Sequence, residues 1–385
     1  MRCEEKTTLN VPERKAVLEL LARSFPPNYL EAKNNFEFFL NEAPNKIYLL
    51  AWLEAELVGV LCLLGRSFNY FGIPLRATGM SYMAAERAHA NFSATEVLKE
   101  KMFVYIEKHS DLSIGFARKV MDGYWYPYGY LGFTNFGELM IERDKLRGRN
   151  SGFSHTPVQE EHLARIGDLF SETYRNVLGS LVRNSSLWSY YLKKAERDRT
   201  VFRALWKDAE LIGYFVVNGN RVLELGVGGI FLEQMPGFLK SYFQEQPALD
   251  GTIVFEIGQT HPLTRILRKF VHTVSQRHAW NGGHIVRIHS IPDFLRKSLP
   301  IFEERLRNAR TSDFLFQWGG LSFGYQGGHL EIEGRIDESL HFDWQKLVLG
   351  ILSPKDILNA TPSVMGTMAI LFPVVSPQVP YFDQL

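Results

Sequence analysis

The segment DLSIGFARKVMDGYWYPYGYLGFTNF, residues 111–136, governs how the rest of the chain is interpreted. It begins as a short apolar run, breaks at Asp122-Gly123 and ends with YGYLGF, residues 128–133. This order predicts a buried strand, a short helix that stops at Gly132, and a sharp turn into a second strand. The phenol of Tyr128 would then lie at the end of a cleft, uncharged near neutral pH and able to donate a proton.

The same residues resemble the end of a GNAT acetyltransferase domain, in which a strand, a helix and a Tyr-x-x-x-Gly-Phe turn place a tyrosine beside the acetyl-CoA thiol. The Tyr-Gly-x-x-Gly-aromatic form, together with the later chain, is most similar to tandem GNAT proteins of the enhanced-intracellular-survival type. That resemblance implies that Tyr128 protonates the departing thiolate. On the residues alone, the aromatic run is open to a second interpretation, as core packed at helical spacing.

Length and composition limit the possible classes of protein. A chain of 385 residues exceeds what one hydrophobic core usually supports, so we expect two or three domains. Apolar residues make up 45% of the chain and charged residues 22%, as in ordinary globular proteins. With 43 basic and 42 acidic residues, the charge balance favours no nucleic-acid partner.

The start of the chain and its cysteines predict a cytoplasmic protein. MRCEEKTTLNVPERK lacks the basic region and apolar core of a secretion signal. The most apolar window, residues 47–65, is interrupted by Glu54 and Glu56, whereas a membrane span needs roughly 20 nearly unbroken apolar residues. Cys3 and Cys62 are too far apart in sequence for a metal pair, and they fit a reducing compartment. We expect no membrane partner and no metal.

Residues 1–146 are expected to form the first domain. Its opening, two helices and then a hairpin whose second strand carries Gly59, resembles the opening of a GNAT domain. Apolar periodicity predicts helices over residues 10–42, broken at Pro26-Pro27, and 91–109, and strands over 47–53, 57–64, 75–84 and 136–143.

The turn before the expected helix at 91–109 is where a GNAT domain binds its cofactor, through a glycine-containing loop that opens the helix. Here residues 85–94 read AERAHANFSA, without the glycine that permits close backbone approach. Several small residues and the basic Arg87 and His89 still suit phosphate groups. The alternative is a degenerate domain in which these two are solvated loop residues. The resemblance implies acetyl-CoA contacts at Met83, Ala84, Ala85, Arg87, His89, Asn91, Phe92, Ser93 and Ala94.

Residues 147–283 repeat the order of the first domain. Helices are followed by expected strands over 201–206 and 211–217, the second of which carries Gly213. This copy has no phosphate-loop pattern and no Tyr-x-x-x-Gly-Phe turn. We interpret it as a second GNAT-like domain without a cofactor that helps to wall the cleft, as the resemblance also implies.

Residues 284–385 begin with an expected strand, Ile285 to Ile288, followed by an expected helix, Ile291 to Arg307. Three short strands between residues 314 and 333 follow. This order resembles the sterol-carrier-like third domain of the same family. The predicted fold class is therefore α+β, with two tandem GNAT-type mixed-sheet domains followed by a sterol-carrier-like α/β domain.

Acyl transfer to an amine needs a neutral amine, a polarised carbonyl and a proton for the thiolate. Tyr128 would supply the proton, and a backbone N–H near Met83 or Ala84 would polarise the carbonyl. The family resemblance implies that the base is the terminal carboxylate of Leu385, buried in the first domain's cleft. Desolvation would raise its proton affinity into a useful range. The alternative is a frayed terminus.

Two other sequence patterns resemble functional sites but lack the context that such sites need. Residues 320–324 match the Gly-x-Ser-x-Gly elbow of hydrolases, but that elbow needs a following helix and a strand is expected there. The spacings of His272, His278, His284 and His289 fit neither one helix face nor one strand face for metal binding.

The sequence thus predicts an N-acetyltransferase that uses acetyl-CoA as co-substrate. The acceptor would be a primary amine of a small molecule or peptide, attacking directly without a covalent enzyme intermediate. Because the tandem family forms multimers, a homo-oligomer is possible. The alternative is a catalytically silent tandem GNAT protein that binds a ligand or a partner.

Overall fold

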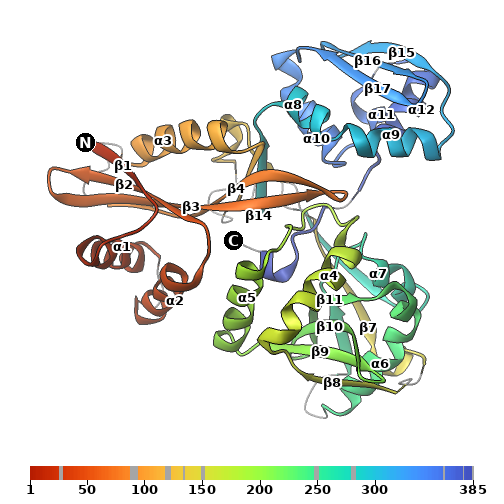
Figure 1. Ribbon diagram of the computed structural model, residues 1–385, viewed down its shortest axis with the longest axis horizontal. Coiled ribbons are helices and arrows are strands. Elements are labelled where there is room, and N and C mark those ends of the chain that lie inside the picture. Colours follow the sequence, from red (N-terminus) through yellow and green to blue (C-terminus); the bar gives the residue numbers. More distant parts are fainter. Residues whose placement is uncertain are drawn as a thin grey trace.

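The computed structural model describes residues 1–25, 29–86, 94–117, 123–132, 135–148, 152–246, 251–278, 283–358, 360–375 and 377–383. Three groups of elements make up this part of the chain, two around mixed sheets and one around a small antiparallel sheet (Figure 1). The C-terminal end of the chain returns to the space between the first and second groups (Figure 1). No helix in the described ranges is long and apolar enough to cross a bilayer.

The first sheet has seven strands in the order β1-β2-β3-β4-β5-β14-β6. Only β4 and β5 are parallel neighbours, and the other described pairs are antiparallel. Its strands are β1 (Arg2–Lys6), β2 (Lys46–Leu53), β3 (Glu56–Tyr70), β4 (Ile73–Ala85), β5 (Leu112–Ala117), β6 (Leu131–Gly132) and β14 (Gly283–Ile288).

Helices cover opposite faces of this sheet. Alternate residues of β3 face opposite ways, as a strand requires. Cys62 and Leu64 therefore pack with α1 (Val11–Ser24) and α2 (Tyr29–Glu42), whereas Leu61 and Leu63 pack with α3 (Ala94–His109). The expected helices and strands of the N-terminal region are confirmed in kind.

The first and second sheets exchange strands. The segment expected to complete the first sheet, found as β7 (Asn135–Glu142), lies instead between β12 (Thr252–Phe255) and β13 (Thr273–His278) of the second sheet. Conversely β14, expected to open the third domain, lies between β5 and β6 of the first. Both strand memberships were therefore predicted wrongly. Apolar alternation specifies that a strand has a buried face, but it does not specify which strands lie beside it.

The second sheet has the order β13-β7-β12-β11-β10-β9-β8. The expected hairpin is confirmed as β9 and β10. Helices α4 and α5 pack on one face, and α6 and α7 on the other. The remaining bounds are β8 (Phe153–Pro157), β9 (Val201–Lys207), β10 (Glu210–Asn218), β11 (Arg221–Val227), β12 (Thr252–Phe255), β13 (Thr273–His278), α4 (Leu163–Tyr174), α5 (Ser185–Arg197), α6 (Met235–Gln244) and α7 (Pro262–Leu267).

The third group confirms the three expected short strands. The single helix expected over residues 291–307 is divided at Ser298, which caps the end of one helix and precedes Pro300 at the start of the next. The strand β17 follows β16, so residues 320–324 do not form a nucleophile elbow. The elements are α8 (Ile291–Lys297), α9 (Leu299–Asn308), β15 (Phe314–Trp318), β16 (Leu321–Gln326), β17 (His329–Gly334), α10 (His341–Val348), α11 (Pro354–Ile357) and α12 (Pro362–Leu371).

The third group shares its core with the first sheet. Phe68 and Tyr70, at the end of β3, belong to the same buried cluster as Phe294 and Trp344. The hydroxyl of Tyr70 donates to the carbonyl of Val348 at 2.8 Å. The third group is therefore packed against the first sheet rather than tethered by a linker alone.

Candidate functional site

The strands β4 and β5 separate halfway along their length. Their register runs from Ala77 to Met80 against Leu112 to Gly115, and the described residues beyond it, 81–85 and 116–117, form no further pairs with each other. On its other edge β4 stays paired with β3, but through a bulge: the register passes from Cys62 opposite Ser81 to Val60 opposite Ala84. The separation leaves backbone groups of β4 facing an opening in the sheet.

The bulge is centred on Tyr82, whose φ of +52° lies in the left-handed region. The extra residue on β4 changes the alternation of the strand and so redirects the side chains on either side of it. The ring of Tyr82 packs edge-on against Phe36 and Phe39 of α2, with centroids 4.9 and 4.7 Å away. Met83 instead packs on the α3 side. The bulge thus directs Tyr82 toward the α1–α2 face of the sheet and Met83 toward the α3 face.

A cavity of about 160 Å³ occupies the opening. Met80, Met83, Trp125 and Ile285, which pack on the α3 side, line it together with Phe25 from the end of α1. The predicted contact residue Met83 therefore lies in the opening, and Ala84 and Ala85 follow it on β4.

The residues described here fit an amide-bearing arm such as the pantetheine of acetyl-CoA. An unpaired strand edge offers N–H and C=O groups at the spacing that amides match. Ala94 is the first residue of α3, and the helix sits close to the sheet because Gly59 has no Cβ; a Cβ there would lie 3.0 Å from Leu98. The other predicted contacts, Arg87, His89, Asn91, Phe92 and Ser93, lie outside the described residues.

A buried lysine holds the hydroxyl of Tyr128. Lys99 of α3 has a side chain that is 2% exposed, and its ammonium donates to the hydroxyl oxygens of Tyr128 at 2.5 Å and Tyr124 at 3.1 Å. It also pairs with Glu96 at 2.5 Å. Burial alone would lower the pKa of Lys99, but the hydrogen bonds to Glu96, Tyr128 and Tyr124 outweigh it and raise the pKa. The ammonium therefore stays charged.

This contact suits proton donation by the phenol. Because the oxygen of Tyr128 accepts from Lys99, the phenolic hydrogen remains available for another acceptor. The adjacent cation would also stabilise the phenolate that remains after the proton has left.

The turn that carries Tyr128 ends at the next residue, Gly129. A short 3-10 helix, η3 (Tyr126–Tyr128), stops at Gly129, whose φ is +83°. Gly132 lies in β6, so its expected role as the helix stop is wrong. A Cβ at Gly129 would lie 3.2 Å from the Nε of Arg287, so both the backbone conformation and the contact favour glycine there.

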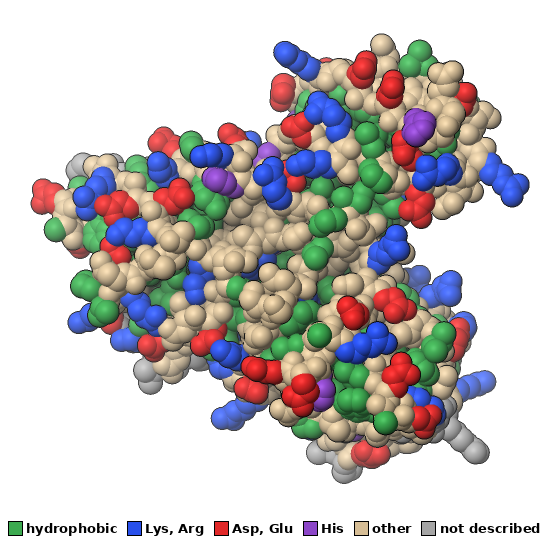
Figure 2. Space-filling view, in the orientation of Figure 1, with side chains coloured by type: hydrophobic (Ala, Val, Ile, Leu, Met, Phe, Trp, Pro, Cys, Tyr) green, Lys and Arg blue, Asp and Glu red, His purple; other side chains and the backbone are tan. Residues whose placement is uncertain are grey.

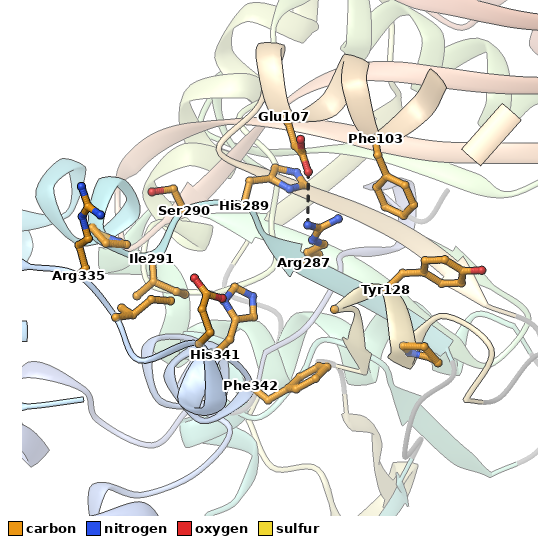
Figure 3. A pocket seen from close by; sticks show the side chains of 15 residues that line it. Phe103, Glu107, Tyr128, Arg287, His289, Ser290, Ile291, Arg335, His341 and Phe342 are labelled. Carbon is orange, nitrogen blue, oxygen red and sulfur yellow. Dashed lines mark hydrogen bonds and ion pairs between the residues drawn. The ribbon is translucent and has the colours of Figure 1, made fainter. Parts of the chain in front are cut away.

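A cavity of about 940 Å³ beside Tyr128 faces its ring and not its hydroxyl (Figure 3). It lies between α3, the η3 turn, the segment after β14 and the third group. Arg287 pairs with Glu107 across it at 3.5 Å. His289 has two buried ring nitrogens without a partner among the described residues, and burial lowers its pKa to about 4. In Figure 3 the hydroxyl of Tyr128 points away from these groups.

A third cavity, of about 240 Å³, lies on the α1–α2 face. Ser81 and Tyr82 of the bulge line it, and so do Phe382 and Asp383 from the C-terminal tail. The buried Asp383 accepts hydrogen bonds from Arg183 Nε at 2.8 Å, the hydroxyl of Tyr191 at 2.9 Å and the backbone N–H of Leu181 at 3.0 Å. These contacts fix the tail here, although Leu385 itself lies outside the described residues.

Sequence reasoning missed Lys99, Tyr82 and Asp383. A weak signal marked Lys99: it lies three residues before Met102, next to the apolar face of its helix. The bulge at Tyr82 has no sequence signature, and the partners of Asp383 lie about 200 residues earlier in the chain. No group of three or more potential metal ligands lies together in the described residues.

Charge is mixed over the face of the molecule seen in Figure 2, where Lys and Arg side chains alternate with Asp and Glu. Electrostatic selection of a ligand on this face would therefore act inside local cavities rather than across a broad patch.

Known proteins resemble this chain in structure. No protein-family profile matches it, and no curated protein matches it in sequence. A GCN5-related N-acetyltransferase from Anabaena variabilis aligns over 100% of both chains, with a TM-score of 0.70 and 14% identity. A conserved protein of unknown function from Enterococcus faecalis, described as a probable N-acyltransferase, aligns over 100% of both chains, with a TM-score of 0.70 and 13% identity.

Eis1 from Mycobacterium abscessus also aligns over 100% of both chains, with a TM-score of 0.64 and 11% identity. Identities this low establish a likeness of fold. With its two mixed sheets, the chain has the tandem GNAT-like architecture of these structures.

Proposed function

We propose that the protein is an acetyl-CoA-dependent N-acyltransferase whose reaction takes place at the opening between β4 and β5. The observation that carries this proposal is the meeting of two cavities at the bulge. Ser81 and Tyr82 line both the cavity of about 160 Å³ in the opening and the cavity of about 240 Å³ on the α1–α2 face. A donor held on the α3 side would thus meet an acceptor that enters from the other side.

The proposed cofactor contacts are those implied by the GNAT resemblance: Met83, Ala84, Ala85, Arg87, His89, Asn91, Phe92, Ser93 and Ala94. The chemistry that acetyl-CoA supplies is an acyl group activated as a thioester. The chain's own part would be to hold the arm along the free edge of β4, with the backbone N–H of Met83 or Ala84 turned toward the thioester oxygen. Tyr128 would give its proton to the thiolate sulfur, while Lys99 holds the phenol oxygen.

For the base we propose the terminal carboxylate of Leu385. Asp383 is fixed in the wall of the acceptor cavity, and two further residues span at most about 7 Å. That reach would allow the carboxylate to approach the bulge. There it would accept the proton that the attacking amine loses.

The three chain ranges, 1–146, 147–283 and 284–385, are proposed to serve as a cofactor-binding GNAT domain, a GNAT-like domain without cofactor and a sterol-carrier-like domain. β7 of the first range lies in the second sheet, and β14, which begins the third range, lies in the first sheet, so these two strands join the ranges. The second domain supplies α5 and the anchor of the tail to the acceptor cavity.

Titration with acetyl-CoA tests the proposal. We expect measurable heat in calorimetry and a raised melting temperature, since a ligand at 100 times its Kd stabilises by about 2.7 kcal/mol. ADP, which lacks the arm and the thioester, is the control and should stabilise less. Thiol release in the presence of primary amines tests turnover. No heat and no stabilisation at millimolar acetyl-CoA would leave the alternative, a catalytically silent protein that binds another ligand or partner.

A further inference from the structure

The charged residues that line the cavity on the α1–α2 face indicate which acceptor it can hold. Three cationic side chains line it: Arg66 from β3, and Lys194 and Arg197 from α5. Asp383 is the one carboxylate among its described lining residues. If this cavity receives the acceptor, as the proposed function holds, these charges select among amines.

The described carboxylates in and beside the cavity are already paired. Asp383 accepts from Arg183, and Arg183 also forms a two-pronged pair with Glu224 at 2.7 and 2.9 Å. Asp198 pairs with Lys194 at 2.7 Å and with Arg197. An acceptor with several positive charges would therefore meet cations and no free described carboxylate.

Arg66 differs from the other two cations because no described carboxylate lies within ion-pair distance of it. Its side chain lines the cavity, and its Nη1 donates to the carbonyls of Pro44 at 3.2 Å and Gly65 at 3.0 Å, two residues of a second cavity of about 280 Å³ that Arg66 also lines. Its Nε is buried and has no hydrogen-bond partner among the described residues. A guanidinium has five N–H donors in a planar fork, so donors remain for a group with two anionic oxygens.

We propose that the acceptor is a small amine that also carries an anionic oxygen group, a carboxylate or a phosphate, and that Arg66 binds this group. The cavity of about 240 Å³ is below the usual range for drug-sized ligands, so it suits a small molecule. Charge pairing at Arg66 would hold the far end of the acceptor while its amine reaches the bulge.

The test compares acceptors that differ only at the end remote from the amine. One series is 6-aminohexanoate, its carboxamide and 1,6-diaminohexane; the other is O-phosphoethanolamine and ethanolamine. Acetyl-CoA-dependent acetylation is followed by mass spectrometry. We expect kcat/KM to be at least about tenfold higher for an anionic member than for its neutral partner, and lowest for the diamine, since a charge-assisted hydrogen bond contributes this much. The series that responds distinguishes carboxylate from phosphate.

Arg66→Gln should remove that preference, lowering kcat/KM about tenfold for the anionic acceptor while changing it less than about threefold for the neutral one. Arg66→Lys should fall between the two, because it keeps the charge and loses the fork. Arg307→Gln, on an exposed arginine of α9 paired with Glu303 at 3.8 Å, is the matched control and should change neither acceptor.

The outcomes separate this inference from the function on which it rests. Equal rates across each series in the wild-type protein would overturn the inference alone, whether or not Arg66→Gln folds. An equal loss of kcat/KM for charged and neutral acceptors in a folded Arg66→Gln protein would also overturn it. That result would indicate that Arg66 pairs with the terminal carboxylate of Leu385 and not with the acceptor. No acetylation of any amine by the wild-type protein would overturn the proposed function, and this inference with it.

Discussion

Tyr128 and Lys99 form a pair in which the lysine prepares the tyrosine. The ammonium is buried, charged and 2.5 Å from the phenol oxygen, so it lowers the cost of leaving a negative charge there. Neither residue contributes this chemistry alone. A lysine in the same place beside a phenylalanine would be a buried cation with fewer hydrogen bonds.

Tyr128→Phe should lower kcat by about 10²-fold or more, because the proton donor is lost. The affinity for acetyl-CoA should change little, since the phenylalanine ring can keep the stacked contact with Phe103, whose centroid lies 5.7 Å away. Turnover by thiol release and binding by calorimetry measure the two effects.

Tyr126→Phe is the matched control, two residues earlier on the same turn. The ring of Tyr126 stacks on Phe342 with centroids 4.4 Å apart, and the substitution keeps that ring, so activity should be unchanged. Equal turnover in Tyr128→Phe and the wild-type protein would remove Tyr128 from the mechanism.

At the scale of elements, α10 of the third group braces the turn that carries Tyr128. Gln345 on α10 is fully buried, and its side-chain amide donates to the carbonyl of Gly129 at 3.0 Å. Its side-chain oxygen accepts from the backbone N–H of Ile288 in β14 at 2.8 Å. One side chain of the third group thus ties together the end of η3 and the exchanged strand.

Gln345→Met should destabilise the protein by about 2–4 kcal/mol. Methionine has a similar size, but it leaves the buried carbonyl of Gly129 and the buried N–H of Ile288 without their hydrogen-bond partner. The Tyr128 turn should also lose precision, so kcat should fall several-fold with little change in KM. Urea unfolding and steady-state kinetics measure the two effects. Gln326→Met, on the exposed end of β16, is the control, and a Gln345→Met protein as stable and active as this control would contradict the brace.

The existence of the strands was more predictable from the sequence than which strands lie beside one another in a sheet. Apolar runs gave β2, β9 and β10, and in β2 and β10 the central residues are buried at successive positions because both faces of the strand are covered. The placement of β7 and β14 depends on pairing between segments more than 100 residues apart, which no local pattern contains. The end of η3 was misplaced from Gly129 to Gly132, since both glycines satisfy the turn pattern and only the tertiary contact with Arg287 distinguishes them.

For the site, sequence predicted Tyr128 through a motif and Met83 through its position at the end of a strand. It did not predict Lys99 as the partner of the phenol. Lysine is rarely buried, and nothing local indicates that Tyr124, Tyr128 and Glu96 surround its ammonium. Residues that act through neighbours distant in sequence become visible only in the folded chain.

At the scale of the whole molecule, the C-terminal tail joins parts that the chain order separates. It leaves the third group, passes Leu178, whose carbonyl accepts from the N–H of Gln378 at 2.8 Å, and ends between the first and second sheets. The anchor is a buried charge network of Arg183, Glu224 and Asp383, all with fully buried side chains. Removing one member of such a network costs much stability, because the remaining charge stays buried without its partner.

Extending the chain beyond Leu385 tests what the anchor serves. A C-terminal tag removes the terminal carboxylate from its place but leaves the contacts of Asp383 intact, so turnover should fall by about 10²-fold or more while the melting temperature stays the same. Asp383→Ala should instead lower both, costing about 3 kcal/mol or more, since Arg183 and the N–H of Leu181 lose an acceptor. An N-terminal tag is the control, and a C-terminally tagged protein with full activity would rule out the carboxylate of Leu385 as the base.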